Sequence, residues 1–304
     1  MNFTLHAVSA LAYSIVIATF ERSEELRVTL DSIAAQTRLP QRVIIVDASH
    51  DGQTRAVADT FTARLPLHCE RAIRPSSAVQ RNQGAAHVGT PLIAFLDDDV
   101  VVRPETFATI VAALEHDEAQ RIGGIAGRIE GLQHRPPRGL LWWYYRLQAG
   151  YAHPTYGAKL FGAAINCLPT YAESDADLIR SDWLNSTCVF YRTALFAREK
   201  FPEFEGYSFL EDVHVSARIG RTHDLFFHRT ATFEHRDATS TFKRDARQLA
   251  RMRVRHRRVV ARDIVGLREP ALTFKLLLHR LFTSACLLRS RHPSWQQEFL
   301  GTWT

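Results

Sequence analysis

The chain has 304 residues, of which 46% are hydrophobic, and 38 basic against 32 acidic residues give a formal net charge of +6. This length supports one large domain or a domain with an appendage, and the mild positive charge favours anionic partners without identifying one. The four cysteines are far apart and show no Cys-x-x-Cys spacing. We interpret them as reduced thiols of a cytosolic protein, not as a disulfide framework or a metal site.

The first predicted element is a strand. AVSALAYSIVIATF (residues 7–20) resembles the apolar part of a signal peptide, but no Lys or Arg precedes it. Within it, YSIVIATF (13–20) is a β-branched run without alternation, which is typical of a strand covered on both faces. We therefore expect a core strand here and no signal peptide.

Helices and strands then alternate. SEELRVTLDSIAAQ (23–36) has apolar residues at helical spacing and two acids in its first turn. RVIIVDAS (42–49) predicts a second buried strand, DGQTRAVADTFTARL (51–65) a second helix, and PLIAFL (91–96) another strand. This order predicts an α/β fold with βαβ units and a mainly parallel sheet, in which ligands bind beyond the carboxyl ends of the strands.

Polar side chains follow three of these strands, namely Thr19, Asp47 and the run Asp97, Asp98 and Asp99. Adjacent carboxylates repel one another, which raises their pKa values unless a cation compensates. Alternation along an extended segment would direct Asp97 and Asp99 to one side and Asp98 to the other. The run suits Mg²⁺ or Mn²⁺ shared with substrate phosphates, and the alternative is a solvated acidic turn.

The second half of the chain is less regular. Residues 121–180 are rich in aromatic residues and glycine and give no clear pattern. STCVFYRTALF (186–196) predicts a strand followed by a helix, and FLEDVHVSARIG (209–220) predicts a helix with acids in its first turn.

Five segments stand in a specific order along the chain: SIVIATFERSEELRVTLDSI, RVIIVDASHDG, QRNQGAAHVGTPLIAFLDDDVVVRPETF, FEGYSFLEDVHVSARI and ATFEH. Together they resemble the family 2 glycosyltransferases with the GT-A fold. They match, in turn, the opening strand and helix, the second strand usually written VDDGSxD, the DxD segment, the ED segment and the following strand with its histidine. The second aspartate of VDDGS is Ala48 here. The matches span residues 13–235, about three quarters of the chain.

The resemblance implies a GT-A catalytic domain over residues 1–240, a Rossmann-like, mainly parallel mixed sheet flanked by helices. The nucleotide-sugar half would span about 10–120 and the acceptor half about 121–240. A helical C-terminal extension, basic and amphipathic, would follow over 241–304. The implied activity is transfer of a sugar from a nucleotide-diphosphate donor to an acceptor hydroxyl, with inversion at the anomeric carbon.

For the donor side, the resemblance makes Asp99 the metal ligand of the DxD motif. Asp97 and Asp98 would contact the ribose, the transferred sugar, or the metal through water. His235 would complete the metal site or contact the diphosphate, and as a ligand its imidazole suits Mn²⁺ better than Mg²⁺. The alternative for His235 is a buried strand histidine.

The resemblance also places Thr19, Arg22, Asp47 and Arg81 in the nucleotide pocket. Asp47 could accept a hydrogen bond from a base ring N–H, as in uracil, thymine or guanine. The alternatives are a strand-end turn for Asp47 and an exposed helix arginine for Arg81.

On the acceptor side, we expect Asp212 to be the single general base of an inverting transfer, with Glu211 orienting the acceptor or the base. The alternative is that both acids only stabilise a helix N-terminus. Trp183 could stack on the apolar face of an acceptor sugar, or it could simply belong to the core.

The C-terminal third begins with a strongly basic segment, residues 243–262, and continues with an amphipathic one, 271–288. QLARM weakly resembles the QxxRW motif of processive relatives, with Met252 in place of Trp, so Gln248 and Arg251 could approach the diphosphate or the acceptor. No uninterrupted apolar run reaches the ~20 residues of a transmembrane helix, and we expect none. Binding of 243–288 to anionic lipids and ordinary packing are both open, whereas nucleic acid is not expected.

These features predict a metal-dependent, inverting transferase that adds a single sugar to a glycan or lipid-linked glycan of the cell envelope, such as lipopolysaccharide, capsule or exopolysaccharide. We expect it in the cytoplasm or peripherally on the inner face of the cell membrane. A sugar nucleotidyltransferase is one alternative, although ATFERSEE lacks the glycine and lysine of its usual loop. A degenerate sugar-nucleotide-binding protein is the other.

Overall fold

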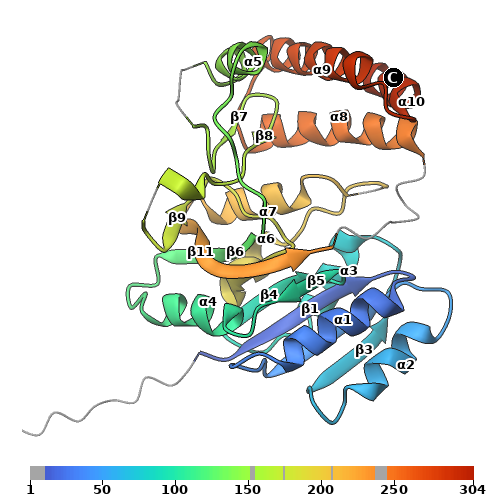
Figure 1. The fold of residues 1–304 in the computed structure, drawn as a ribbon, viewed down its shortest axis with the longest axis vertical. Coiled ribbons are helices and arrows are strands. Elements are labelled where there is room, and N and C mark those ends of the chain that lie inside the picture. The colour runs from blue at the N-terminus through green and yellow to red at the C-terminus, as the bar shows by residue number, and fades with distance from the viewer. Residues whose placement is uncertain (1–10, 151–154, 174, 207, 237–244) are drawn as a thin grey trace, which may run out of the picture.

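A computed structural model of the protein describes residues 11–150, 155–173, 175–206, 208–236 and 245–304. Among these residues, nine strands form one mixed sheet in the order β3-β2-β1-β4-β10-β6-β11-β5, with β9 paired to β11, and helices cover both faces (Figure 1). The expected fold class is confirmed. The strands are β1 (Tyr13–Thr19), β2 (Arg42–Asp47), β3 (Leu67–Arg71), β4 (Leu92–Asp97), β5 (Val100–Val102), β6 (Ile122–Ile129), β7 (Leu160–Phe161), β8 (Ile165–Asn166), β9 (Leu178–Arg180), β10 (Cys188–Arg192) and β11 (Asp224–His235). The helices are α1 (Ser23–Ala34), α2 (Gln53–Thr60), α3 (Ser77–Ala85), α4 (Thr106–Glu115), α5 (Leu140–Ala149), α6 (Thr193–Glu199), α7 (Glu211–Ile219), α8 (Ala246–Asp263), α9 (Ala271–Ser290) and α10 (Trp295–Trp303).

The first half of the sheet is parallel, as the alternation of strands and helices predicts. β1 pairs in parallel with β2 on one side and β4 on the other, and β2 pairs in parallel with β3. Successive β1 side chains enter opposite cores, because Ile15 and Ile17 pack with α1 whereas Val16 packs with α3. Both faces are therefore apolar, and the strand appears in the sequence as an unbroken hydrophobic run.

Antiparallel strands complete the sheet. β10 pairs antiparallel with both β4 and β6. The long β11 runs parallel to β6 and then antiparallel to β5, with register shifts between Phe227 and Thr232. This bend carries the end of β11 next to the end of β4, where the aspartate run lies.

The C-terminal helices form a separate layer beyond the sheet, with α8 nearer the catalytic half and α9, α10 and α5 outside it (Figure 1). Val260 and Leu272 share a hydrophobic core with Leu210 and Val213, which flank the predicted catalytic pair. α10 crosses α8 closely at Gly301, where an added Cβ would lie 2.1 Å from the carbonyl oxygen of Arg247. The extension therefore packs as part of the same body.

Helix α9 bears on the expectation that no helix spans a membrane. Its 20 residues have a mean hydropathy of 1.4 over an 18-residue window, of which 22% is buried, so by length and composition it could span a membrane. Lys275, His279 and Arg280 interrupt its apolar sequence, and α5, α8 and α10 pack against it, so the expectation stays a prediction. The predicted signal-like segment begins in residues 7–10, which lie outside the described residues, whereas its second half forms β1.

Candidate active site

A cleft of about 360 Å³ opens at the carboxyl ends of β1 and β4, between the end of β11 and the start of α7. It is lined by Thr19, Arg22, Gln80, Arg81, Asp97, Asp98, Asp99, Asn166, Ser186, Thr187, Ser208, Phe209, Glu211, Asp212 and His235, among others. Five of the predicted site residues, on β1, β4, α3 and α7, therefore meet in one place with Arg22, Asp98, Asp99 and His235.

The three aspartates occupy a tight turn rather than an extended segment. Asp97 ends β4, and Asp98 and Asp99 form the turn before β5. Asp98 is buried and accepts hydrogen bonds from the Thr19 hydroxyl at 2.7 Å and from the Arg22 guanidinium at 2.9 Å. Burial raises the pKa of Asp98 to about 7, although Arg22 opposes the shift. Asp98 is thus held by Thr19 and Arg22 and is not one of the three residues whose ligand atoms come together.

Asp97, Asp99 and His235 form a group that can hold a metal ion. One ligand atom from each lies within 4.8 Å of the others, and Nε2 of His235 is 3.3 Å from Oδ1 of Asp99. The β11–β5 ladder fixes this approach, because His235 pairs with Val100 and the Arg236 backbone N–H donates to the Asp99 carbonyl at 3.0 Å. Two carboxylates and an imidazole form a donor set that suits Mn²⁺ better than Mg²⁺, which prefers oxygen ligands alone.

Arg81 connects the two sides of the cleft. Its guanidinium is buried and donates to Asp97 at 2.6 Å and to Glu211 at 3.2 Å. The alternative of an exposed helix arginine is wrong. The preceding residue, Gln80, is also buried and donates to the carbonyl oxygens of Thr19 and Val46, which fixes α3 against the strand ends. No sequence pattern distinguished Gln80.

Glu211 and Asp212 begin α7, after Leu210 in a left-handed conformation with φ 65°. Burial raises the pKa of Asp212 to about 7, and the charge of Glu211 adds to the shift. Burial also raises the pKa of Glu211, against the charge of Arg81. A carboxylate that titrates near neutral pH can accept a proton far better than an ordinary aspartate, so Asp212 has the property that a general base needs.

Residues 14–168, about half of the chain, match the model of glycosyl transferase family 2. The chain belongs to this family. It is therefore a glycosyltransferase, which favours sugar transfer over both alternatives considered from the sequence.

Two curated relatives share part of the sequence of this glycosyltransferase. Validoxylamine A glucosyltransferase of Streptomyces hygroscopicus subsp. limoneus is 34% identical over 106 residues, which are 33% of this chain and 23% of the relative. Glucosyl-dolichyl phosphate glucuronosyltransferase of Haloferax volcanii is 31% identical over 116 residues, which are 36% of this chain and 37% of the relative. The matched part thus spans less than two fifths of either relative.

Two solved structures share the fold. A mannosyltransferase from Pyrobaculum calidifontis, in complex with GDP-Man and Mn²⁺, has a TM-score of 0.57 at 16% identity, over 96% of this chain and 73% of that one. TarS 1–349 of S. aureus, in complex with UDP-GlcNAc, has a TM-score of 0.58 at 17% identity, over 96% of this chain and 79% of that one.

Two expected residues of the transferase lie outside the cleft lining. Trp183 is 3% exposed, donates its indole N–H to the Cys167 carbonyl at 3.0 Å and packs edge-on against Phe227. Its ring cannot stack on a sugar, so the acceptor interpretation is wrong and the core alternative is correct. Asp47 ends β2, and its Oδ1 accepts a hydrogen bond from the Ser49 backbone N–H at 2.9 Å, as in the strand-end turn. Its role in binding a base stays a prediction.

Sequence reasoning missed most of the opposite wall of the cleft. Asn166 ends β8, Ser186 and Thr187 precede β10, and Ser208 and Phe209 precede α7. Asn166 and Ser208 come from segments without a clear pattern, whereas Ser186, Thr187 and Phe209 begin segments predicted as a strand and a helix, where nothing in the pattern marks their side chains as cleft residues.

Gln248 and Arg251 lie in a neighbouring groove instead of the cleft. This groove, of about 690 Å³, runs between α8, α9 and α10 and also contains Arg255, Arg258 and Arg280. Gly206 lines both the groove and the cleft. Neither residue therefore lines the cleft, and their approach to the diphosphate or the acceptor stays a prediction.

Proposed function

We propose that this glycosyltransferase moves a single sugar from a nucleotide-diphosphate donor to an acceptor hydroxyl, with inversion and with a divalent cation. One observation carries the proposal. Asp212, whose pKa is raised to about 7 by burial, lines the same cleft as the metal-binding group of Asp97, Asp99 and His235. The first can remove a proton from the acceptor, and the second can hold a cation beside the donor diphosphate.

On the donor side, Asp97, Asp99 and His235 would hold the cation, which neutralises negative charge on the departing diphosphate. Arg22 is 3.1 Å from Asp99 and 2.9 Å from Asp98, so it lies at the edge of this group and adds positive charge for phosphate oxygens. The Mn²⁺ and GDP-Man in the Pyrobaculum calidifontis structure, of the same fold, agree with this arrangement.

On the acceptor side, Asp212 takes the proton of the attacking hydroxyl. The bond between the acceptor oxygen and the anomeric carbon forms as the bond from that carbon to the diphosphate oxygen breaks, and the diphosphate leaves with the electron pair. Arg81 donates hydrogen bonds to Glu211, beside this base, and to Asp97. It therefore fixes the acceptor end of the site relative to the donor end. Because the acceptor hydroxyl attacks the anomeric carbon directly, without a covalent intermediate between sugar and protein, the configuration at that carbon is inverted.

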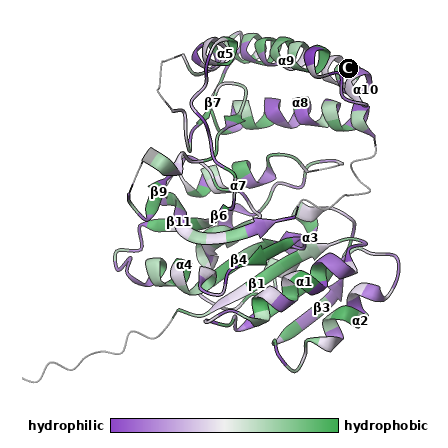
Figure 2. Ribbon diagram, in the orientation of Figure 1, coloured by the Kyte–Doolittle hydropathy of each residue, from purple (hydrophilic) through white to green (hydrophobic). Residues whose placement is uncertain are grey.

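We further propose that the enzyme acts at a membrane surface. Phe274, Leu277, Leu281 and Leu288 are exposed along one face of α9, at helical spacing. Leu140, Trp143 and Leu147 are exposed in the same way on α5, which packs beside α9. Figure 2 shows both helices on the outer side of the molecule, away from the sheet.

The charges around this apolar face favour anionic lipids. Neither α5 nor α9 contains an acidic residue, and Arg138, Arg146, Arg289 and Arg291 are exposed in or next to them. The basic α8 contributes less positive charge to this surface than its sequence implies. Three of its arginines form ion pairs with acidic side chains, namely Arg255, Arg258 and Arg262. Arg257 donates hydrogen bonds to the carbonyl oxygens of Ala163 and Ala164.

A cytoplasmic enzyme held on the inner face of the cell membrane would meet a lipid-linked glycan acceptor there. The groove between α8, α9 and α10 adjoins the cleft at Gly206, and Arg251 and Arg280 in its lining suit an acceptor that carries phosphate. We therefore place the enzyme in the synthesis of a cell-envelope glycan.

Thermal unfolding of the purified protein with UDP, dTDP, GDP, ADP and CMP tests the donor part of the proposal, each with Mn²⁺, with Mg²⁺ and with chelator. A ligand of the folded state raises the midpoint by mass action. We expect one diphosphate to raise it in the presence of metal only, which also identifies the base of the donor. If no nucleotide raises the midpoint under any condition, the metal-dependent donor site is wrong.

A further inference from the structure

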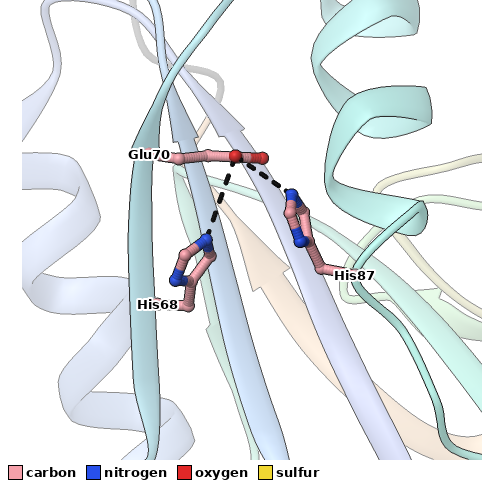
Figure 3. A group of neighbouring side chains, drawn as sticks. All are labelled: His68, Glu70 and His87. Atoms are coloured by element: carbon pink, nitrogen blue, oxygen red, sulfur yellow. Dashed lines mark hydrogen bonds and ion pairs between the residues drawn. The ribbon is translucent and has the colours of Figure 1, made fainter.

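A second group of metal-ligating side chains lies on the edge strand of the sheet, apart from the cleft. His68 and Glu70 are two residues apart on β3 and so face the same way, and His87 follows α3 (Figure 3). Nε2 of His87 is 3.1 Å from Oε2 of Glu70, and Nε2 of His68 is 3.9 Å from the same oxygen. One ligand atom from each residue lies within 4.8 Å of the others.

Hydrogen bonding explains only part of this group. The contact between His87 and Glu70 is an ordinary hydrogen bond, but 3.9 Å from His68 to Glu70 is too long for one. Nε2 of His68 and Oε1 of Glu70 are both inaccessible to solvent and have no hydrogen-bond partner among the described residues. Buried polar atoms normally form a hydrogen bond. Two buried polar atoms without one in the same group therefore indicate a ligand that the group shares.

The spacing fits a small cation with tetrahedral geometry. Two ligands about 2.0–2.1 Å from a tetrahedral zinc ion lie about 3.3 Å apart. The observed separations of 3.1 and 3.9 Å bracket that value, so small rotations of the rings would complete the site. No Lys or Arg forms an ion pair with Glu70 among the described residues, so no basic side chain competes with a cation for this carboxylate.

We propose that His68, Glu70 and His87 bind a divalent cation of the zinc type, with water in the fourth position. Two imidazoles and one carboxylate are the donors that zinc accepts, whereas Mg²⁺ favours oxygen ligands alone. The three side chains are 20–40% exposed, so the group lies near the surface although Nε2 of His68 is itself buried. This site is distinct from the group of Asp97, Asp99 and His235, which belongs to the donor cleft.

The cation would join the end of α3 to the edge strand. α3 carries Gln80 and Arg81 into the cleft, and β3 has only one neighbouring strand, β2, in the described sheet. A bond between them restrains a helix on which the cleft depends. Because this group lies apart from the cleft, loss of the cation should alter stability more than the chemistry of transfer.

Zinc stoichiometry tests the proposal on the full-length protein, measured by isothermal titration after treatment with chelator. Because the donor cleft can also take zinc, the titration is made in Asp99→Asn, which removes a ligand there. We expect one remaining equivalent in this background and a loss of at least about tenfold in its affinity on adding His68→Ala or His87→Ala. His116→Ala, an exposed histidine at the end of α4, is the matched control and should bind as its parent does.

A second measurement separates ligand loss from misfolding. The metal-free variants should unfold at temperatures close to that of the metal-free parent, and zinc should raise the midpoint of the parent and of His116→Ala only. If the parent binds no zinc, or if His68→Ala and His87→Ala bind zinc as the parent does, the site does not exist. The proposal is also overturned if His116→Ala weakens zinc binding as much as His68→Ala and His87→Ala do.

Discussion

Nη2 of Arg81 lies 2.6 Å from a carboxylate oxygen of Asp97, and Nη1 of Arg81 lies 3.2 Å from a carboxylate oxygen of Glu211. Asp97 belongs to the predicted metal group. Arg81 is buried, so both contacts are made away from bulk water. One side chain thus fixes Asp97 relative to Glu211. In the proposed transfer, these residues stand on the donor and acceptor sides, and the two substrates must react in line.

Replacement of Arg81 by Gln should destabilise the protein by about 3–5 kcal/mol, because it leaves Asp97 and Glu211 without their compensating charge. Urea unfolding measures this change. Arg74→Gln is the control, since Arg74 is exposed and pairs with Glu203 at the surface, and it should cost less than about 1 kcal/mol. Equal losses in the two variants would show that the buried position of Arg81 has no special importance.

Asp99→Asn should abolish metal-dependent binding of the nucleoside diphosphate, because a neutral amide is a much poorer ligand for a divalent cation. Titration calorimetry with the diphosphate, with and without Mn²⁺, measures the effect. Asp59→Asn, at an exposed position on α2, should bind normally. If Mn²⁺ still strengthens diphosphate binding in Asp99→Asn, Asp99 is not a ligand of the metal.

Asp212→Asn should bind the donor normally and transfer sugar about 10²–10⁴-fold more slowly, because the acceptor hydroxyl loses its general base. Single-turnover transfer and donor titration separate the two effects. Asp182→Asn, an acidic residue outside the cleft, serves as the control. If Asp212→Asn transfers at a near-normal rate, another group is the base.

The rate of transfer should fall at low pH with a midpoint near the pKa of Asp212, about 7. The sign follows from the role of this group: burial raises its pKa, so the carboxyl is protonated and inactive below pH 7 and is a free base above it. Below the midpoint, kcat/KM should decrease about tenfold per pH unit. A rate that is constant from pH 8 down to pH 5 would contradict the assignment.

Leu277→Glu together with Leu281→Glu should weaken binding to vesicles that contain anionic lipid, because charges would replace apolar contacts on the exposed face of α9. Co-sedimentation with the vesicles measures binding. Leu39→Glu, at an equally exposed position far from α9, should bind as the wild type does. Binding that is unchanged in the double variant would place the membrane contact, if any, on another surface.

Much of the catalytic half could be predicted because its strands are buried on both faces. β1, β2 and β4 appear as unbroken apolar runs, and the aspartates follow directly at a strand end. Strand β3 was missed because it lies at the sheet edge, where the side chains are only partly buried and the sequence LHCER shows no apolar run. The position of Trp183 could not be inferred either, since both core packing and sugar stacking favour an aromatic ring.

The shared core of α7, α8 and α9 limits how this enzyme can be divided. Val260 and Leu272 pack with Leu210 and Val213, immediately beside Glu211 and Asp212. The last helices therefore cannot be exchanged between transferases as an independent cassette, because a substituted segment would have to match the back of the catalytic helix. During synthesis, Asp212 acquires its final surroundings only after α8 and the start of α9 have left the ribosome.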